Sequence, residues 1–108
     1  IFAAMELVDK LMALRSAGDE AGAAALFAED GTISTPKGDH PKGREAILKF
    51  FEKNPVPKDP PTFGPWSEPE PGTFVRDGSM KKLVFTISIQ QTVVIAGGQI
   101  QSMVVKKK

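Results

Sequence analysis

The chain has 108 residues, 41% hydrophobic and 25% charged, a composition typical of one folded domain with a single core. Its 14 basic and 13 acidic side chains leave a net charge of +1, which argues against a nucleic-acid-binding surface because such a surface needs a marked basic excess. The absence of cysteine excludes disulfides and thiolate chemistry, and the single His40 excludes a histidine-rich metal site. We therefore expect no metal and no cofactor.

The sequence also bears on the membrane and on the N-terminus. No apolar run approaches the roughly 20 residues of a membrane-spanning helix, so we expect a soluble protein without a membrane span. The chain begins with Ile1 instead of methionine, which predicts a processed or truncated N-terminus. The compartment is left open.

The first third of the chain predicts two helices. Residues 2–15 repeat apolar side chains at spacings of three and four, which gives one broad apolar stripe. Gly18 is predicted to end this helix, and Asp19 to cap a second one over residues 20–29.

A short strand is predicted over residues 32–35, and a turn rich in proline and glycine over residues 36–43. A third helix is predicted over residues 44–53, with alanine, isoleucine and two phenylalanines on its apolar side.

Residues 55–71 contain seven of the nine prolines, which excludes a helix and a central strand. The segment over 54–72 is therefore predicted to be a proline-rich loop, either on the surface or along a sheet edge. Trp66, the only tryptophan, lies inside it. We expect this side chain to pin the loop to the body; the alternatives are a pocket wall or an interface anchor.

The last third predicts a β meander. A strand over residues 72–76 is expected to meet a long strand over 81–96 across a tight turn at 77–80. The two glycines at 97–98 predict a second hairpin turn before a returning strand over 99–107. The three final lysines are predicted to be solvated.

Two stretches of this order resemble the nuclear transport factor 2-like superfamily. Residues 16–51 are similar to the front half of ketosteroid isomerase and SnoaL-like proteins, and "GGQIQSMVV" at 97–105 is similar to their last hairpin. The resemblance implies a single α+β domain over 1–108, cone-shaped, with three N-terminal helices packed against a curved, mostly antiparallel sheet around an apolar pocket. Residues 54–80 depart from the family pattern because they are proline-rich and short for its middle strands.

The resemblance also implies positions for catalysis. The isomerase branch places a carboxylate base at the end of its first strand, before a proline, and this chain has Thr35 there. It places hydrogen-bond donors in the first helix and on the long strand, at the positions of Leu11 and Gln90. A threonine hydroxyl is too weak a base for proton abstraction near neutral pH, and leucine has no donor. The frame of an active site is therefore predicted without its base.

The long strand leaves the direction of Gln90 open. Phe85, Ile87 and Ile89 alternate with Thr86, Ser88 and Gln90. Gln90 can face the pocket only if a bulge near Gln90 and Gln91 switches this alternation. Without a bulge, Ile89 faces the cavity and the polar row lies on the outer sheet face, either as a homodimer interface, by which family members often pair, or as solvated strand.

Four charged or titratable side chains near the first strand are weaker catalytic candidates: Glu29, Asp30, Asp39 and His40. Asp30 and His40 are retained as possible catalytic residues, but solvated turn positions are the favoured interpretation because adjacent turn residues seldom reach catalytic geometry. The predicted pocket residues are Leu11, Phe27, Thr35, Phe50, Trp66 and Gln90.

The sequence therefore predicts a non-catalytic domain that binds a small apolar ligand or serves as an assembly module. One alternative is a SnoaL-like cyclase or isomerase acting on a polycyclic or polyketide-like substrate. Another is an accessory subunit of a larger protein complex, docked through the proline-rich segment and Trp66.

Overall fold

The computed structural model of the chain describes residues 2–56, 60–81 and 83–108. Three sequence-based predictions touch residues outside these ranges: the processed N-terminus at Ile1, the proline-rich loop at residues 57–59 and the long strand at Lys82.

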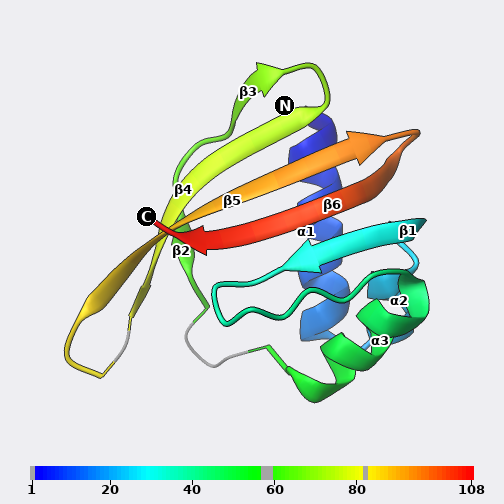
Figure 1. Cartoon of the computed structure of the whole chain (residues 1–108), viewed down its shortest axis with the longest axis horizontal. Coiled ribbons are helices and arrows are strands. Elements are labelled where there is room, and N and C mark those ends of the chain that lie inside the picture. The colour runs from blue at the N-terminus through cyan, green and yellow to red at the C-terminus, as the bar shows by residue number, and fades with distance from the viewer. Residues whose placement is uncertain (1, 57–59, 82) are drawn as a thin grey trace.

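The first half is mainly helical and the second half is β (Figure 1). The helices and the strand between them are α1 (Phe2–Ser16), α2 (Glu20–Ala24), β1 (Phe27–Ser34) and α3 (Arg44–Lys53). The later strands are β2 (Thr62–Phe63), β3 (Ser67–Glu70), β4 (Thr73–Lys81), β5 (Thr86–Ala96) and β6 (Gln99–Lys107).

In the described part of the chain, the strands form one six-stranded sheet in the order β1-β6-β5-β4-β2, with β3 also paired to β4. β1 runs parallel to β6, and the other pairings are antiparallel. The sheet is open and curled. Because it contains one parallel pair among antiparallel ones, it is a mixed sheet, and the fold is of the α+β class. A parallel pair needs a long connection, and α3 and the whole meander provide it between β1 and β6.

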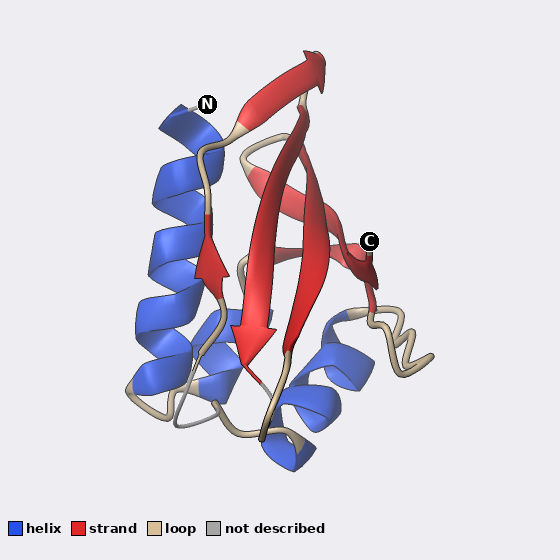
Figure 2. Ribbon diagram, turned by 90° about the vertical axis from the view of Figure 1, so that its left-hand side faces the viewer, coloured by secondary structure: helices blue, strands red, loops and turns tan. Residues whose placement is uncertain are grey.

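The core lies between the helices and one face of the sheet. Figure 2 shows α1 running along that face. Val8, Phe27, Ile47, Val93 and Ile100, from five different elements, are fully buried there. Removing these side chains from water is the main source of the fold's stability. No helix within the described ranges is long and apolar enough to cross a membrane.

The second predicted helix is too long. α2 ends at Ala24, and residues 27–29 belong to β1 instead. Phe27 pairs with Ile100 of β6 and its side chain is fully buried. The alanine-rich pattern favoured a continuing helix, but packing against β6 decides the structure here. The strand therefore separates two helices from the third, as predicted, but it starts earlier.

The hairpin turn predicted at 77–80 is wrong. β4 continues through these residues to Lys81, and Gly78 pairs with Ile89. The glycine at position 78 serves close packing instead of a turn. A Cβ atom there would lie 2.5 Å from Phe63 Cδ1 and 2.6 Å from the Thr62 carbonyl oxygen. The glycine thus permits β2 to approach closely, a role glycine also has in strands. The second predicted turn is confirmed, since Gly97 and Gly98 have φ of 59° and 76° between β5 and β6.

The proline-rich segment contains more regular structure than a loop. Its described part includes β2 and β3, which both pair with β4 at the sheet's edge. Pro69 lies within β3, where an edge position tolerates its missing N–H. The edge alternative therefore describes this segment better than the loop.

Candidate functional site

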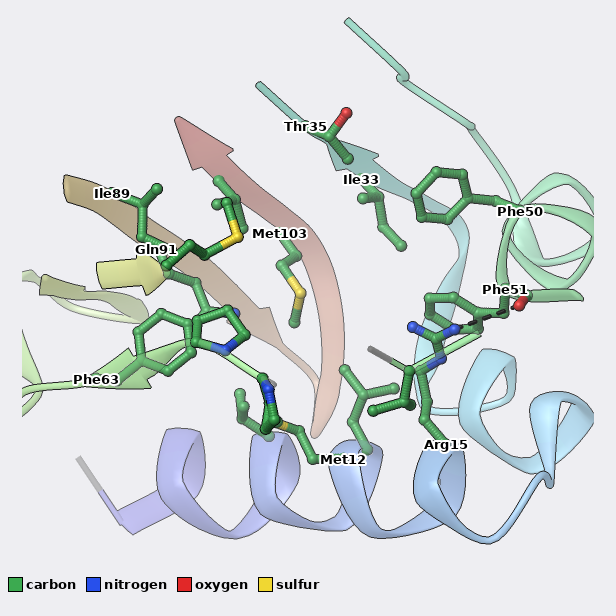
Figure 3. A pocket seen from close by; sticks show the side chains of 17 residues that line it. Met12, Arg15, Ile33, Thr35, Phe50, Phe51, Phe63, Ile89, Gln91 and Met103 are labelled. Carbon is green, nitrogen blue, oxygen red and sulfur yellow. Dashed lines mark hydrogen bonds between the residues drawn. The ribbon is translucent and has the colours of Figure 1, made fainter. Parts of the chain in front are cut away.

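A cavity of about 240 Å³ lies between α1, α3, β2 and the inner face of the sheet. Figure 3 shows Phe50 and Phe51 on one side of it and Phe63 and Gln91 on the other. Its walls are mostly apolar, contributed by Val8, Leu11, Met12, Ile33, Phe50, Phe51, Val56, Pro60, Pro61, Phe63, Met80, Ile89, Met103 and Val105. Three polar residues complete the lining: Arg15, Thr35 and Gln91.

Gln91 is the polar group that the fold buries at this cavity; only 6% of it is exposed. Along β5, Ile89, Gln91 and Val93 are all buried and so share the inner face, with no bulge at this point. Gln90 faces outward and does not line the cavity. The predicted pocket role of Gln90 is therefore corrected to Gln91, because the strand keeps its period-two alternation.

The amide of Gln91 has a defined orientation. Its Oε1 accepts a hydrogen bond of 2.6 Å from Arg76 Nε, on the directly paired strand position. Because arginine has only donors, the oxygen must face Arg76 and the amide nitrogen must point elsewhere. Within the described ranges, no group accepts a hydrogen bond from Gln91 Nε2, and no fully buried side-chain nitrogen lacks a partner. Nε2 therefore lies at an accessible surface, and Gln91 is one of the residues that line the cavity.

Arg76 is held between two aromatic rings. Its guanidinium carbon lies 3.8 Å from the ring centroid of Phe63 and 4.3 Å from that of Trp66. Burial lowers the pKa of Arg76, and the negative charge of Asp9 acts in the opposite direction. Because the pKa of an arginine side chain lies far above neutral pH, Arg76 stays charged. Its planar guanidinium group is held between the two rings and positions Gln91.

Arg15 lies at the opposite side of the cavity, and its Nε and Nη2 donors are engaged with other parts of the protein. Nε donates to Glu20 Oε2 at 3.2 Å, while Nη2 donates to the carbonyl oxygens of Phe51 and Asn54. The guanidinium carbon also lies 4.3 Å from the ring centroid of Phe51. These contacts tie the end of α1 to the end of α3, so Arg15 is a structural part of the wall.

Thr35 lies in the cavity wall, where the isomerase branch has its base. Its hydroxyl oxygen donates to Asp39 Oδ2 and accepts from the Asp39 backbone N–H, both at 3.2 Å. The hydroxyl thus closes the turn that follows β1. Asp39 is exposed and does not line the cavity.

The other sequence candidates lie in three kinds of place. Leu11 and Phe50 line the cavity, whereas Phe27 is fully buried behind it, with its ring centroid 6.0 Å from that of Phe51. Trp66 is half-buried against the core under Arg76 and does not line the cavity. Its ring therefore packs on the domain itself, as expected for a residue that pins the edge segment.

The weaker catalytic candidates lie outside the cavity. Asp30 is exposed and accepts a hydrogen bond of 3.1 Å from Gln101 Nε2. His40 is exposed, with Nδ1 2.6 Å from the Gly38 carbonyl oxygen. Among residues 2–56, 60–81 and 83–108, no three side chains of His, Cys, Asp or Glu gather in a way that could hold a metal ion.

No protein-family model and no curated protein sequence matches the chain, but solved structures do. A protein from Sphaerobacter thermophilus is 28% identical, with a TM-score of 0.72 over 100% of this chain and 98% of that one. A nuclear transport factor 2-like protein of unknown function from Cytophaga hutchinsonii is 20% identical, with a TM-score of 0.72 over 96% of this chain and 88% of that one.

A third similar structure is a hypothetical protein with a ketosteroid isomerase-like fold from Catenulispora acidiphila, in complex with trimethylamine. It is 18% identical, with a TM-score of 0.72 over 93% of this chain and 83% of that one. At such identities the likeness concerns the fold alone. The resemblance read from the sequence is thereby confirmed: the chain has the fold of the nuclear transport factor 2-like superfamily, shared with ketosteroid isomerase-like proteins.

Proposed function

We propose that this domain binds a compact, mainly apolar molecule that carries one hydrogen-bond acceptor, such as a carbonyl oxygen, without converting it. The observation that carries the proposal is Gln91 Nε2, a donor without a partner among the described residues, at the wall of an apolar cavity. A hydrocarbon bound there would cut this donor off from water and leave it unpaired, which costs about 1–3 kcal/mol, so a ligand oxygen is favoured over a hydrocarbon. Burial of the apolar remainder of the ligand supplies the rest of the affinity.

The size of the cavity supports a compact ligand. Its 240 Å³ lies below the range of about 300–1,000 Å³ typical of pockets for drug-sized ligands. A small ketone or lactone suits this volume better than a polycyclic substrate.

The polar lining supports binding without catalysis. Arg15 offers only hydrogen-bond donors, the Thr35 hydroxyl is bonded to Asp39, and Gln91 is a neutral amide. Among the described residues, no carboxylate or imidazole lines the cavity, so none of the usual general bases stands beside a ligand there.

Two molecules of nearly equal shape test the acceptor. Acetophenone has a carbonyl group where ethylbenzene has a methylene, and calorimetry gives the dissociation constant of each. The ratio of the two constants reports the hydrogen bond. We expect acetophenone to bind more tightly by roughly 2- to 10-fold, from a net hydrogen bond of about 0.5–1.5 kcal/mol.

The variant Gln91→Glu is nearly isosteric and keeps an oxygen for Arg76, but it replaces the free donor with an acceptor. It should abolish the preference for acetophenone over ethylbenzene. Gln90→Glu makes the same change one residue away on the outer face and should leave the ratio as in the unaltered protein. If the two variants change the ratio equally, or Gln91→Glu leaves it unchanged, the acceptor proposal is wrong.

The absence of catalysis has its own test. Incubation with an unsaturated 3-ketosteroid, followed by absorbance, should show no isomerisation above background. Clear turnover would assign a base to this chain and contradict the non-catalytic part of the proposal, while the binding ratio would still test Gln91.

A second proposal, homodimer formation, has support from the outer sheet face. Thr92 pairs with Val75 on one side and Val104 on the other, and Val94 pairs with Ser102, so half-buried uncharged side chains adjoin across three strands. A face of this kind suits a second copy of the chain. Light scattering at micromolar concentration should give the mass of a dimer, and Val94→Lys should reduce it to that of a monomer; a strict monomer for the unaltered chain contradicts the proposal.

A further inference from the structure

The end of the β4–β5 hairpin projects away from the helices and the rest of the sheet, at the lower left of Figure 1. Leu83, Val84 and Phe85 lie there with 102%, 92% and 58% of their surfaces exposed. Single exposed apolar residues are ordinary on protein surfaces, but three in a row at a projecting tip are not, because they add no stability to the fold.

The chain that forms and follows this tip is basic. Residues 78–108 contain five lysines and no acidic residue, whereas residues 1–77 contain more acidic than basic residues. Lys81 pairs with Thr86 at the base of the tip. The basic stretch Lys106–Lys108 runs beside β5, where Lys107 pairs with Ile89, about 13 Å along the strand from Phe85.

Among the residues that the structure describes, one acidic side chain forms an ion pair with this basic stretch. Asp77 Oδ2 lies 3.1 Å from Lys108 Nζ, and both side chains are about half exposed. The exposed side chains of Lys81, Lys106 and Lys107 have no acidic partner among the described residues. The tip is thus apolar, and positively charged side chains lie behind it. We call the whole region the hairpin end (Lys81, residues 83–85 and Lys106–Lys108).

We propose that the hairpin end docks on the surface of a lipid bilayer that contains anionic lipids. Leu83, Val84 and Phe85 would enter the boundary between head groups and acyl chains, and the lysines would contact lipid phosphates and carboxylates. This combination of apolar side chains in front and lysines behind is what a charged membrane surface attracts. The chain lies on the membrane in this arrangement and does not span it.

The geometry favours a membrane over a nucleic acid. A nucleic acid uses a basic surface but offers no apolar layer for three protruding aliphatic and aromatic side chains. A bilayer needs no complementary shape, so a convex point can enter it.

Vesicle sedimentation tests the proposal with the full chain. We expect binding to vesicles of phosphatidylcholine with one fifth phosphatidylserine, and little binding to phosphatidylcholine alone. Each lysine near the membrane surface contributes about a fivefold gain in affinity. The affinities for vesicles with and without phosphatidylserine should therefore differ strongly. Binding should fall steeply at an ionic strength of about 1 M, where the Debye length is only about 3 Å.

Variants separate the two parts of the hairpin end. The double variant Leu83→Ser with Phe85→Ser should lose most vesicle binding, and the triple change of Lys106, Lys107 and Lys108 to Gln should lose the preference for anionic lipid. Phe2→Ser with Met5→Ser is the matched control, because these residues are also exposed and apolar but lie on α1. It should bind vesicles like the unaltered chain. Thermal unfolding of each variant checks that the fold is retained.

Three results would overturn the proposal. The first is equal binding to neutral and anionic vesicles, the second is no binding to either, and the third is an equal loss in the α1 control. Light scattering without vesicles adds a fourth: if Leu83→Ser with Phe85→Ser dissociates a dimer, the tip contacts a second copy of the chain instead.

Discussion

In the body of the domain, Phe27, Ile47 and Ile100 are fully buried, and no fully buried side-chain polar atom of the described residues lacks a hydrogen-bond partner. At the hairpin end, Leu83 and Val84 are almost wholly exposed, and the charged side chains that belong to it are lysines. Large apolar side chains therefore have different consequences in the two regions. In the body they hold the fold together and shape a cavity, whereas at the hairpin end they add nothing to the fold and are free to contact something outside it.

The largest contrast between the regions should appear when one apolar side chain is removed from each. Phe27→Ala leaves a void in the core and should lower the free energy of unfolding by about 3–5 kcal/mol. Leu83→Ala should change it by less than about 0.5 kcal/mol, because no packing is lost. Urea unfolding followed by Trp66 fluorescence gives both values. A comparable cost for the two variants would mean that the tip packs against the domain in solution.

A second contrast concerns two glycines near the cavity. Gly78→Ala places a Cβ 2.5 Å from Phe63 Cδ1 and 2.6 Å from the Thr62 carbonyl oxygen, so β2 must move. We expect a loss of about 1–3 kcal/mol in the free energy of unfolding, from overpacking. Because Phe63 lines the cavity, acetophenone binding should weaken as well.

Gly64→Ala is the matched control, because its added Cβ would lie 3.6 Å from the Asp77 carbonyl oxygen, at ordinary contact distance. It should preserve both stability and binding. If Gly78→Ala is also harmless, β2 does not hold the wall of the cavity in the way described.

The outcome for the wall residues shows how far sequence reasoning reaches. Leu11, Thr35 and Phe50 lie in the cavity wall, at positions that the resemblance and the apolar stripes indicated. These positions depend on local patterns, a helical repeat and a strand followed by proline, which a sequence displays directly.

Gln91 and Arg76 were missed for reasons that are not local. The family pattern places the hydrogen-bond donor at Gln90, although Gln91 continues the inward-facing series of Ile89 and Val93. A polar residue within that apolar series is the feature of the sequence that indicates a donor facing the cavity. Arg76 faces Gln91 only because β4 pairs with β5 in one particular register, and the false turn at 77–80 concealed that register.

The stacking of Arg76 between two rings should contribute less to the stability of the body than the core and glycine positions do. Arg76→Lys keeps a positive charge but loses the flat group that stacks between Phe63 and Trp66. We expect the free energy of unfolding to fall by about 0.5–2 kcal/mol. The preference for acetophenone over ethylbenzene should also shrink, because the Gln91 amide is then less firmly oriented.

Arg44→Lys is the control for this change, since the Nε of Arg44 donates to the Phe27 carbonyl oxygen at 2.8 Å and no aromatic ring of the described residues stacks on its guanidinium. It should leave the ligand preference unchanged. A full ligand preference in Arg76→Lys would show that Gln91 is oriented by its own packing and that Arg76 has only a structural role.

The smallest effect on stability should come from Asp77, which joins the two regions. Asp77 pairs with Lys108 at 3.1 Å, and both side chains are well exposed, so the pair contributes less than about 1 kcal/mol to the free energy of unfolding. Asp77→Asn should therefore leave the urea transition almost unchanged.

The same variant should affect membrane binding. It removes the acidic side chain that pairs with the basic stretch in the described structure and releases Lys108. If the hairpin end docks on anionic lipid, this variant should bind phosphatidylserine-containing vesicles about fivefold more tightly, the gain expected for one additional effective lysine. Equal vesicle binding by Asp77→Asn and the unaltered chain would mean that Lys108 does not contact the membrane, and would confine the docking surface to Lys81, Lys106, Lys107 and the apolar tip.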